Sequence, residues 1–176
     1  KYAVCVFDKD KNKISALKNI TVAGNPVDLL RESELIILAV KPQDFDPLLK
    51  EIKDFAQDKL IVSIAAGVTT GYIEKVLGHL KVVRVMPNLA VKVAQSATSI
   101  CKGAFATIND LKFVHKLFKY LGVVFIFPED MMDAATAIAG SGPGFWCDRV
   151  QDKPRGKWKD YNSDYFIPEF SLAAEK

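Results

Sequence analysis

The sequence predicts an α/β fold with an open, doubly wound and mostly parallel sheet, followed by the start of an all-helical domain. Short apolar runs alternate along the chain with amphipathic stretches, which is typical of strand–helix–strand units. Most of these runs are apolar at every position, as in strands that are buried on both faces of a parallel sheet. The alternation stops after Pro128, where a helix-forming stretch follows directly.

The apolar runs predict the strands. They cover residues 2–7, 20–22, 35–40, 60–65, 82–86, 97–101 and 123–127. The run at residues 35–40 (LIILAV) is the most apolar, and Lys41 and Pro42 close it. Gly67 and Pro87 follow two of the later runs in the same way. We expect each of these strands to be buried.

The amphipathic stretches predict helices, with apolar side chains at a spacing near 3.6 residues. They lie near residues 14–17, 29–30, 45–55, 70–77 and 110–120. Asn25 or Asp28 can cap the second of these helices, and Gly78 ends the fourth. Residues 8–13, between the first strand and the first helix, predict a polar turn.

The last part of the chain is predicted to be helical. Residues 130–139 favour a helix, residues 140–144 (GSGPG) break it, and residues 151–165 predict a polar loop. A further helix can open after Pro168, because proline suits the first turn of a helix. We therefore expect two domains, at residues 1–129 and 130–176.

Composition and charge exclude several function classes. Apolar residues make up 49% and charged residues 26% of the chain, an ordinary balance for a globular protein. The net charge is +3 and the lysines are scattered, so we expect no nucleic-acid partner. The lysine cluster at residues 153–159 fits a solvated loop or, alternatively, an anion-binding patch. No stretch approaches the roughly 18 apolar residues of a membrane span, and the first residues do not resemble a signal peptide.

The cysteines indicate neither a metal site nor a disulfide framework. Cys5, Cys101 and Cys147 are far apart, and no Cys/His spacing is typical of metal ligands, so we expect no metal. Two of them lie in predicted strands, where a thiol is a small buried side chain. This pattern is typical of a reducing compartment, and we expect a cytoplasmic protein.

In a doubly wound sheet, ligands bind beyond the carboxyl ends of the strands, so the residues that follow the strands form the candidate site. Asp8 can accept hydrogen bonds from an adenosine ribose, or it can lie in a solvated turn whose lysines neutralise it. Lys41 fits a loop along a cofactor, or a turn that leads into a helix. The amide of Asn88 can bond a carboxamide or an imine, or it can cap a turn. Ser141 can expose N–H groups to a carboxylate or imine near a helix start, or it can lie in a plain interhelix turn.

Other catalytic arrangements do not stand out. His79 and His115 fall in a turn and a helix, where we expect structural or surface roles. No phosphate-binding G-x-G-x-x-G follows a strand near the beginning. Because that loop joins the first strand to the first helix of a dinucleotide-binding fold, we expect that a leading strand–helix unit of about 25–30 residues is missing.

Four segments, taken in order, resemble one family. They are residues 39–43 (AVKPQ), 63–69 (SIAAGVT), 84–88 (RVMPN) and 133–143 (DAATAIAGSGP). Together they are similar to pyrroline-5-carboxylate reductase, over roughly residues 2–146. The resemblance implies a Rossmann-like dinucleotide-binding domain and an NADPH- or NADH-dependent reduction of the cyclic imine pyrroline-5-carboxylate to proline. It also implies a helical second domain that builds a homodimer or a larger ring.

The resemblance implies roles for individual residues as well. The cofactor-binding residues would be Asp8, Lys9, Asn25, Ala39, Val40, Lys41, Pro42, Ile64, Ala65, Ala66 and Asn88. Asp8 and Asn25 would face the adenosine ribose or its 2′-phosphate, and Asn88 would approach the nicotinamide. Ser141 and Gly142 would belong to the imine pocket, and Ser141 and Asn88 are the candidate catalytic residues.

The sequence departs from the family in several places. Leu89 and Ala90 stand where the family usually has Thr-Pro, and Gln95 and Ser96 stand where it has Glu-Gly. After Phe145, a loop with proline and glycine replaces the family's long helix. Two alternatives therefore stay open: a related imine or β-hydroxyacid-type reductase, and a truncated nucleotide-binding domain without activity. We expect the isolated chain of 176 residues to bind a cofactor weakly.

Overall fold

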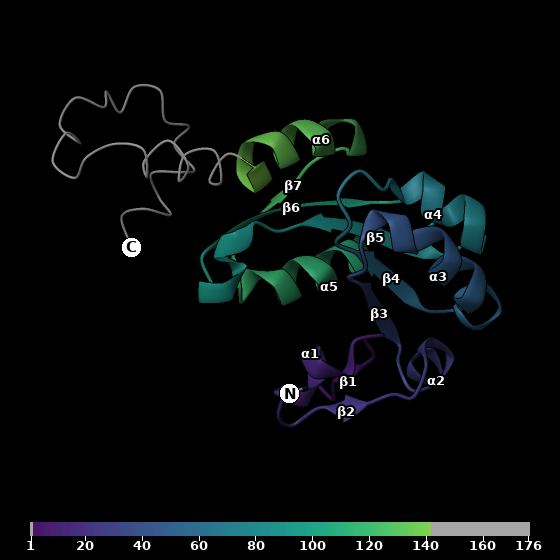
Figure 1. Ribbon diagram of the computed structural model, residues 1–176. Coiled ribbons are helices and arrows are strands. Elements are labelled where there is room, and N and C mark those ends of the chain that lie inside the picture. Colours follow the sequence, from purple (N-terminus) through teal and green to yellow (C-terminus); the bar gives the residue numbers. More distant parts are fainter. Residues whose placement is uncertain (1, 142–176) are drawn as a thin grey trace, which may run out of the picture. The chain divides into compact units, whose positions relative to one another are not determined.

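The computed structural model describes residues 2–141 of the chain (Figure 1). These residues form parallel strands and helices in alternation, which confirms the predicted α/β fold class. Several expectations lie outside the described residues. They concern Gly142, the rest of the glycine-rich break, Cys147, the loop with its lysine cluster, and the last helix.

The strands form two sheets. β1 (Cys5–Val6) and β2 (Thr21–Val22) are a parallel pair on their own. The second sheet has five strands in chain order: β3 (Leu35–Leu38), β4 (Leu60–Ser63), β5 (Lys81–Met86), β6 (Ser96–Lys102) and β7 (Gly122–Ile126). All predicted strands are present, within a few residues of their expected bounds. In the parallel register, Leu38 is the partner of Ser63 and Ser96 that of Gly122.

The first five helices lie between strands and the sixth follows the last strand; the first helix begins at Lys11, inside the stretch that was predicted to be a polar turn. The helices are α1 (Lys11–Ser15), α2 (Pro26–Arg31), α3 (Phe45–Ile52), α4 (Thr70–Leu77), α5 (Ile108–Lys119) and α6 (Met132–Ala135). Short 3-10 turns are η1 (Pro42–Asp44), η2 (Lys53–Phe55), η3 (Leu89–Val93) and η4 (Glu129–Met131). A π-helical segment, η5 (Thr136–Ser141), follows α6.

Local capping explains where the clearest helices begin and end. The hydroxyl of Thr69 accepts the N–H of Tyr72 at the start of α4, and Gly78 ends this helix with a φ of 98°. At the start of α5, the Asp110 carboxylate accepts the N–H of Thr107 over 2.8 Å, and the Thr107 hydroxyl accepts the N–H of Asp110 over 3.2 Å. This reciprocal pair is a capping box.

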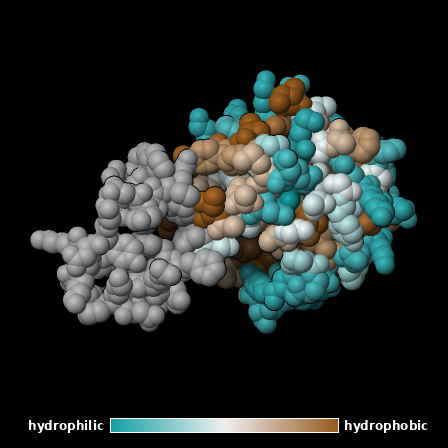
Figure 2. All heavy atoms as spheres, turned by 90° about the horizontal axis from the view of Figure 1, so that it is seen from above, coloured by the Kyte–Doolittle hydropathy of each residue, from teal (hydrophilic) through white to brown (hydrophobic). Residues whose placement is uncertain are grey.

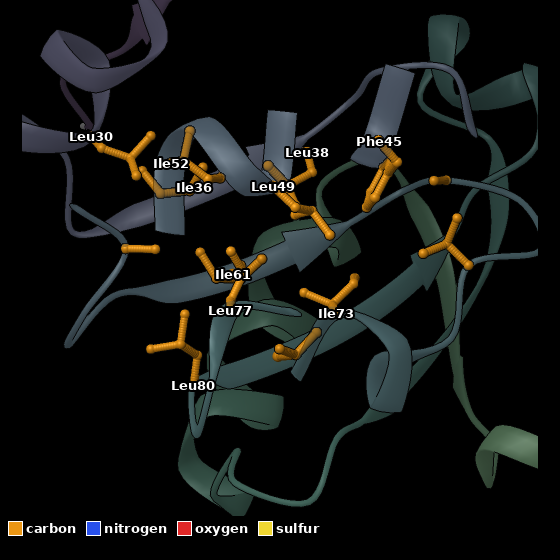
Figure 3. Close-up of a cluster of buried hydrophobic side chains, with 14 residues drawn as sticks. Leu30, Ile36, Leu38, Phe45, Leu49, Ile52, Ile61, Ile73, Leu77 and Leu80 are labelled. Carbon is orange, nitrogen blue, oxygen red and sulfur yellow. The ribbon is translucent and has the colours of Figure 1, made fainter. Parts of the chain in front are cut away.

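The described residues divide into two compact units. The first unit comprises the chain up to Arg84 together with Lys102–Asp110. Its core is a cluster of apolar side chains from α2, α3 and α4 that pack against β3 and β4 (Figure 3). Leu49, Ile61 and Ile73 are completely buried in this cluster. Truncating such a side chain to alanine typically costs about 2–5 kcal/mol, so this cluster stabilises the three helices on the sheet.

The second unit comprises Val85–Cys101 and the described residues from Leu111 onward. Val85, Ile100 and Val114 are completely buried in it. The strand β6 also buries three hydroxyl side chains, those of Ser96, Thr98 and Ser99. The predicted domain boundary near residue 129 remains a prediction.

Four strands are less buried than predicted, and three of them, β1, β2 and β7, contain no buried residue. Ile37 in β3 is 46% exposed, and Val4 beside β1 is 50% exposed. Among the described residues, β1 pairs with β2 alone and β3 pairs with β4 alone. Each strand therefore has one edge without a neighbouring strand in this part of the chain, and side chains at an edge are covered by fewer neighbours. The expectation that a leading strand–helix unit is missing remains a prediction.

The helical segment after residue 130 differs from the prediction. Gly140 and Ser141, the first two residues of the predicted break, continue the helix as the π-helical segment η5, and residues 142–144 of that break lie outside the described residues. The Thr136 hydroxyl donates a 2.7 Å hydrogen bond to the carbonyl oxygen of Met132, four residues earlier. A hydroxyl that competes for this carbonyl loosens the regular α-helical ladder, and wider π-helical turns occur at such places.

The surface combines polar and apolar side chains. On the face shown in Figure 2, hydrophobic residues lie among hydrophilic ones. Leu89 and Val93 in η3 are among the most exposed apolar side chains, at 73% and 69%. Within residues 2–141, none of the helices combines the length and the apolar character needed to cross a membrane.

Candidate functional site

Asp8 and Asn25 follow two paired strands of the first unit. The N–H of Ala23, directly after β2, donates a 2.9 Å hydrogen bond to the carbonyl oxygen of Val6 in β1. This bond continues the β1–β2 pairing, so the carboxyl ends of the two strands are neighbours. Asp8 is half-buried. Its Oδ1 accepts the N–H of Asp10 over 2.8 Å, and its Oδ2 lies 3.9 Å from Nζ of Lys13. This ion pair is long and exposed, so it holds the carboxylate only weakly and a ligand can replace it.

Asn25 is the N-cap of α2. The sequence alone had allowed either Asn25 or Asp28 in this role. Oδ1 of Asn25 accepts the N–H of Asp28 over 2.9 Å, and its Nδ2 donates to Oδ2 of Asp28 over 2.7 Å. Both ends of the amide are therefore engaged locally. A ligand at Asn25 has to share or replace these bonds.

The segment after β3 lies beside the segment after β4. The N–H of Ile64 donates to the carbonyl oxygen of Leu38 over 3.1 Å, so Ala39–Val40 and Ile64–Ala65 leave the sheet next to each other. The side chains of Ala39 and Ala66 are small and exposed, whereas Ala65 is buried. Such a surface lets a flat ligand approach the main chain closely.

Lys41 and Pro42 begin the 3-10 turn η1, and both are exposed. The N–H of Asp44 donates to the carbonyl oxygen of Lys41 over 2.9 Å. The turn that leads into a helix is therefore present. Lys41 is exposed, so its charged end remains available to a ligand.

Gly67 completes the loop after β4. Its φ of 73° lies in the left-handed region, which glycine adopts without the strain that other residues incur. A Cβ atom at this position would meet nothing within 4 Å, so the space above the loop is open. Ala66 and Gly67 in this loop are thus exposed, near the segment that follows β3.

Asn88 follows β5 and belongs to the second unit. Its main-chain N–H donates to Oγ of Ser96 over 3.1 Å, and its side-chain Oδ1 accepts the N–H of Ala90 over 3.2 Å. The predicted turn-capping role is therefore present, since Asn88 is the N-cap of η3. Among residues 2–141, Nδ2 of Asn88 has no hydrogen-bond partner, and the half-buried side chain can offer this group as a donor.

The sequence-based site lacked the two hydroxyl residues behind Asn88. Ser96 and Thr98 are completely buried, and their hydroxyl oxygens lie 2.9 Å apart. Side chains at alternate positions of a strand share one face of the sheet, as the hydroxyl side chains at positions 96 and 98 do. That spacing was the signal in the sequence for this pair.

Ser141 is exposed and is the last residue of the π-helical segment η5 that the structure describes. Its neighbour Gly140 packs close to the end of β5. A Cβ atom on Gly140 would lie 3.8 Å from Cε of Met86, two residues before Asn88. The structure thus brings the Ser141 segment near the strand end that carries Asn88. Gly142 lies outside the described residues.

The two histidines, and Tyr72 with its raised pKa, make contacts that indicate structural roles. The His79 ring lies 4.5 Å from the Phe105 ring, and His115 is half-buried in α5. The hydrogen bond between the Tyr72 hydroxyl and the Asp46 carboxylate raises the pKa of Tyr72 above its ordinary value. That bond links α4 to α3 and lies outside the candidate site.

These groups suit a nucleotide cofactor better than acid–base hydrolysis. The segments after the strands present small residues, exposed main chain, exposed lysines and amide side chains. Within the described residues no group of three potential metal ligands comes together. In sites of this kind a bound cofactor carries out the chemical step, and the protein binds and orients that cofactor.

Comparisons with known proteins point to the same class. Residues 1–67 match the family model described as NADP oxidoreductase, coenzyme F420-dependent. A pyrroline-5-carboxylate reductase from Methanosarcina acetivorans is 39% identical over 142 residues, which cover 80% of this chain and 53% of that protein. The chain spans about half the length of the curated relatives it matches.

Solved structures of the same kind of enzyme resemble the chain. A pyrroline-5-carboxylate reductase from Coxiella burnetii aligns with a TM-score of 0.75 and 27% identity, over 84% of this chain and 57% of that one. The Plasmodium falciparum pyrroline carboxylate reductase, solved with NADP bound, aligns with a TM-score of 0.79 and 25% identity. That alignment covers 97% of this chain and 63% of the Plasmodium chain.

Proposed function

The chain belongs to the pyrroline-5-carboxylate reductase family, and we propose that its protein reduces 1-pyrroline-5-carboxylate to L-proline with NADPH or NADH, in proline biosynthesis. The observation that carries this proposal is the likeness to reductases of that name over most of the described residues. The candidate site supports it, because every strand end that the resemblance assigned to the cofactor carries small or polar groups.

The residues present fit a nicotinamide cofactor. Ala39, Ala66 and Gly67 leave the main chain accessible at the ends of β3 and β4, and the space over Gly67 is open. We propose that the segments Ala39–Pro42 and Ile64–Ala66 line the cofactor. Asp8, Lys9 and Asn25 would contact the adenosine ribose or its 2′-phosphate.

A bound nicotinamide supplies the hydride of such a reaction. In the proposed step the imine carbon accepts the hydride, and the electron pair of the C=N bond moves to the protonated nitrogen, which gives the ring amine of proline. Asn88 would hold the nicotinamide through its Nδ2 donor. The exposed hydroxyl of Ser141 would bond the imino acid, together with Gly142.

The same resemblance also suggests a cellular compartment and an oligomeric state. We propose a cytoplasmic protein that assembles through its helical domain into a homodimer or a larger ring. Size-exclusion chromatography with light scattering on the complete protein tests the assembly. A monomer at micromolar concentration would contradict it.

The substrate is tested by a comparison of reaction classes with the complete protein. The oxidation of NADPH and of NADH is followed with 1-pyrroline-5-carboxylate and with a six-membered cyclic imino acid. The reduction of NADP⁺ and NAD⁺ is followed with β-hydroxy acids. We expect turnover with the cyclic imines, fastest with pyrroline-5-carboxylate. Turnover with hydroxy acids alone would contradict the proposal, and cofactor binding without any turnover would favour a nucleotide-binding domain.

A further inference from the structure

We infer that the buried hydroxyl pair Ser96–Thr98 positions Asn88 toward the nicotinamide, which makes Ser96 a positioning residue of the proposed reaction. The inference rests on the proposed function, because it takes Asn88 as the residue that touches the cofactor. It concerns groups of the second unit alone, and the contacts that carry it are all within that unit.

Ser96 supplies an acceptor for the main chain of Asn88. Oγ of Ser96 accepts the N–H of Asn88 over 3.1 Å and lies 2.9 Å from Oγ1 of Thr98. Both hydroxyl side chains are completely buried, so neither has water as an alternative partner. A serine hydroxyl combines one donor with two acceptor lone pairs, so it can take the N–H and remain bonded to the threonine. Losing a buried partner leaves the remaining group unsatisfied, which keeps this arrangement in place.

The same contacts fix which end of the Asn88 amide faces outward. The main chain of Asn88 is held by Ser96, and its side-chain Oδ1 is held by the N–H of Ala90 over 3.2 Å. The amide therefore presents Nδ2, a donor, away from the turn. A donor is the group that suits the carboxamide oxygen of a nicotinamide.

Ser96 is itself a rigid reference point. Its N–H donates to the carbonyl oxygen of Leu121 over 2.8 Å, where β7 begins. Gly122 passes so close that a Cβ atom there would lie 2.1 Å from the carbonyl oxygen of Ser96. The main chain of Ser96 thus has little room to move. Because the Ser96 hydroxyl accepts the N–H of Asn88, it restricts the position of Asn88 as well.

The strand also offers a matched control. Ser99 is 2% exposed in the same strand, and it lies on the opposite face from Ser96 and Thr98 because side chains alternate along a strand. The change Ser99→Ala removes the same atom from a buried serine but leaves the pair and Asn88 intact.

The test uses the complete protein and four variants: Ser96→Ala, Ser99→Ala, Asn88→Ala, and Ser96→Ala combined with Asn88→Ala. The kcat/KM for pyrroline-5-carboxylate is measured at saturating NADPH, alongside the Tm. We expect Ser96→Ala to lower kcat/KM roughly fivefold, the effect of one typical hydrogen bond, and Ser99→Ala to change it less than twofold. In the Asn88→Ala background, Ser96→Ala should cause no further loss, because residues that act through one another are not additive.

Two results would overturn the inference while the proposed function stands. One is an equal kcat/KM for Ser96→Ala and Ser99→Ala. The other is that Ser96→Ala lowers kcat/KM in the Asn88→Ala background as much as it does in the wild type. A wild-type protein without turnover would instead overturn the proposed function, and the inference with it. If Ser96→Ala does not fold, Thr98→Val removes the second hydroxyl at nearly constant shape. A lowered kcat/KM is expected for that variant too, and an unchanged value would overturn the inference.

Discussion

Asn25 and Asp28 exchange two hydrogen bonds at the start of α2. The N–H of Asp28 donates to Oδ1 of Asn25 over 2.9 Å, and Nδ2 of Asn25 donates to the Asp28 carboxylate over 2.7 Å. The carboxylate also lies near the positive end of the helix dipole, which stabilises it. Asn25 therefore has a structural role that does not depend on a cofactor, and the two roles can be separated by mutation.

We expect Asn25→Ala to lower the free energy of unfolding by about 1 kcal/mol, because alanine cannot accept the N–H of Asp28. Asn25→Ser keeps an acceptor oxygen and should cost much less. Urea unfolding of both variants checks this. If the two variants are equally stable but bind NADPH with different affinities, Asn25 acts on the cofactor rather than as a cap.

Asp8 should influence the choice between NADH and NADPH. A carboxylate at this position accepts hydrogen bonds from a ribose 2′-OH and repels a 2′-phosphate. We expect Asp8→Asn to shift the ratio of kcat/KM values toward NADPH, by roughly tenfold for about 1.4 kcal/mol of relieved repulsion. Steady-state kinetics with both cofactors measures the shift.

Asp10 provides the matched control for this experiment. It carries the same charge two residues away, where it caps α1 by accepting the N–H of Asn12 over 3.0 Å. Asp10→Asn removes the charge but retains a good cap. A similar shift in both variants would assign the effect to the general field of the loop and not to Asp8.

Two glycines should respond to alanine with opposite signs. Gly122 has a φ of 140°, and its Cβ atom would lie 2.1 Å from the carbonyl oxygen of Ser96, so Gly122→Ala should destabilise the protein by about 2–4 kcal/mol. Gly71 lies inside α4, where a Cβ atom would meet nothing within 4 Å. Gly71→Ala should stabilise by about 0.5–1 kcal/mol. Thermal unfolding measures the Tm of both variants. Equal changes in Tm at the two sites would contradict the close approach of Gly122 to Ser96 in the β6–β7 pairing.

The capping box at α5 should make stability depend on acid pH. Burial alone would raise the pKa of Asp110, but hydrogen bonds from Thr107 and the charge of Lys81, 3.8 Å away, outweigh it and lower the pKa below its ordinary value. A carboxyl group with a lowered pKa in the folded state stabilises the protein above its unfolded pKa, and this contribution is lost as the pH falls through the folded pKa.

Asp110→Asn should therefore cost about 1 kcal/mol at pH 7, and the difference from wild type should shrink below about pH 4. Urea unfolding across this range measures the difference. Asp54→Asn, at an exposed position in η2, is the control and should show no such trend. A difference for Asp110→Asn that stays constant down to pH 2 would contradict the lowered pKa.

Local signals in the sequence were sufficient for much of the fold. The helix at residues 70–77 has the predicted bounds because Thr69 caps it and Gly78 ends it. The degree of burial of β1 and β3 could not be predicted, since it depends on which strands lie beside them. The π-helical turn at Thr136–Ser141 was also missed, because the residue types in this stretch do not distinguish it from an α-helix.

The positions of the segments that follow the strands were predictable from the sequence, but the contacts of their side chains were less so. Parallel strands end at one edge, so the segments after β3 and β4 were expected to be neighbours, and a hydrogen bond from Ile64 to Leu38 joins them. The atoms that each side chain engages depend on tertiary structure. Both ends of the Asn25 amide are occupied, whereas Asn88 keeps a donor because Ser96 and Ala90 hold its other groups.

The central claim, hydride transfer to the imine carbon of pyrroline-5-carboxylate, is tested most directly by isotope transfer. The complete protein is incubated with pyrroline-5-carboxylate and NADPH that carries deuterium at the transferable position of the nicotinamide, and the product is analysed by mass spectrometry and NMR. We predict L-proline with one deuterium at C5. Cofactor oxidation without labelled proline, or no reaction with either nicotinamide cofactor, would contradict the account.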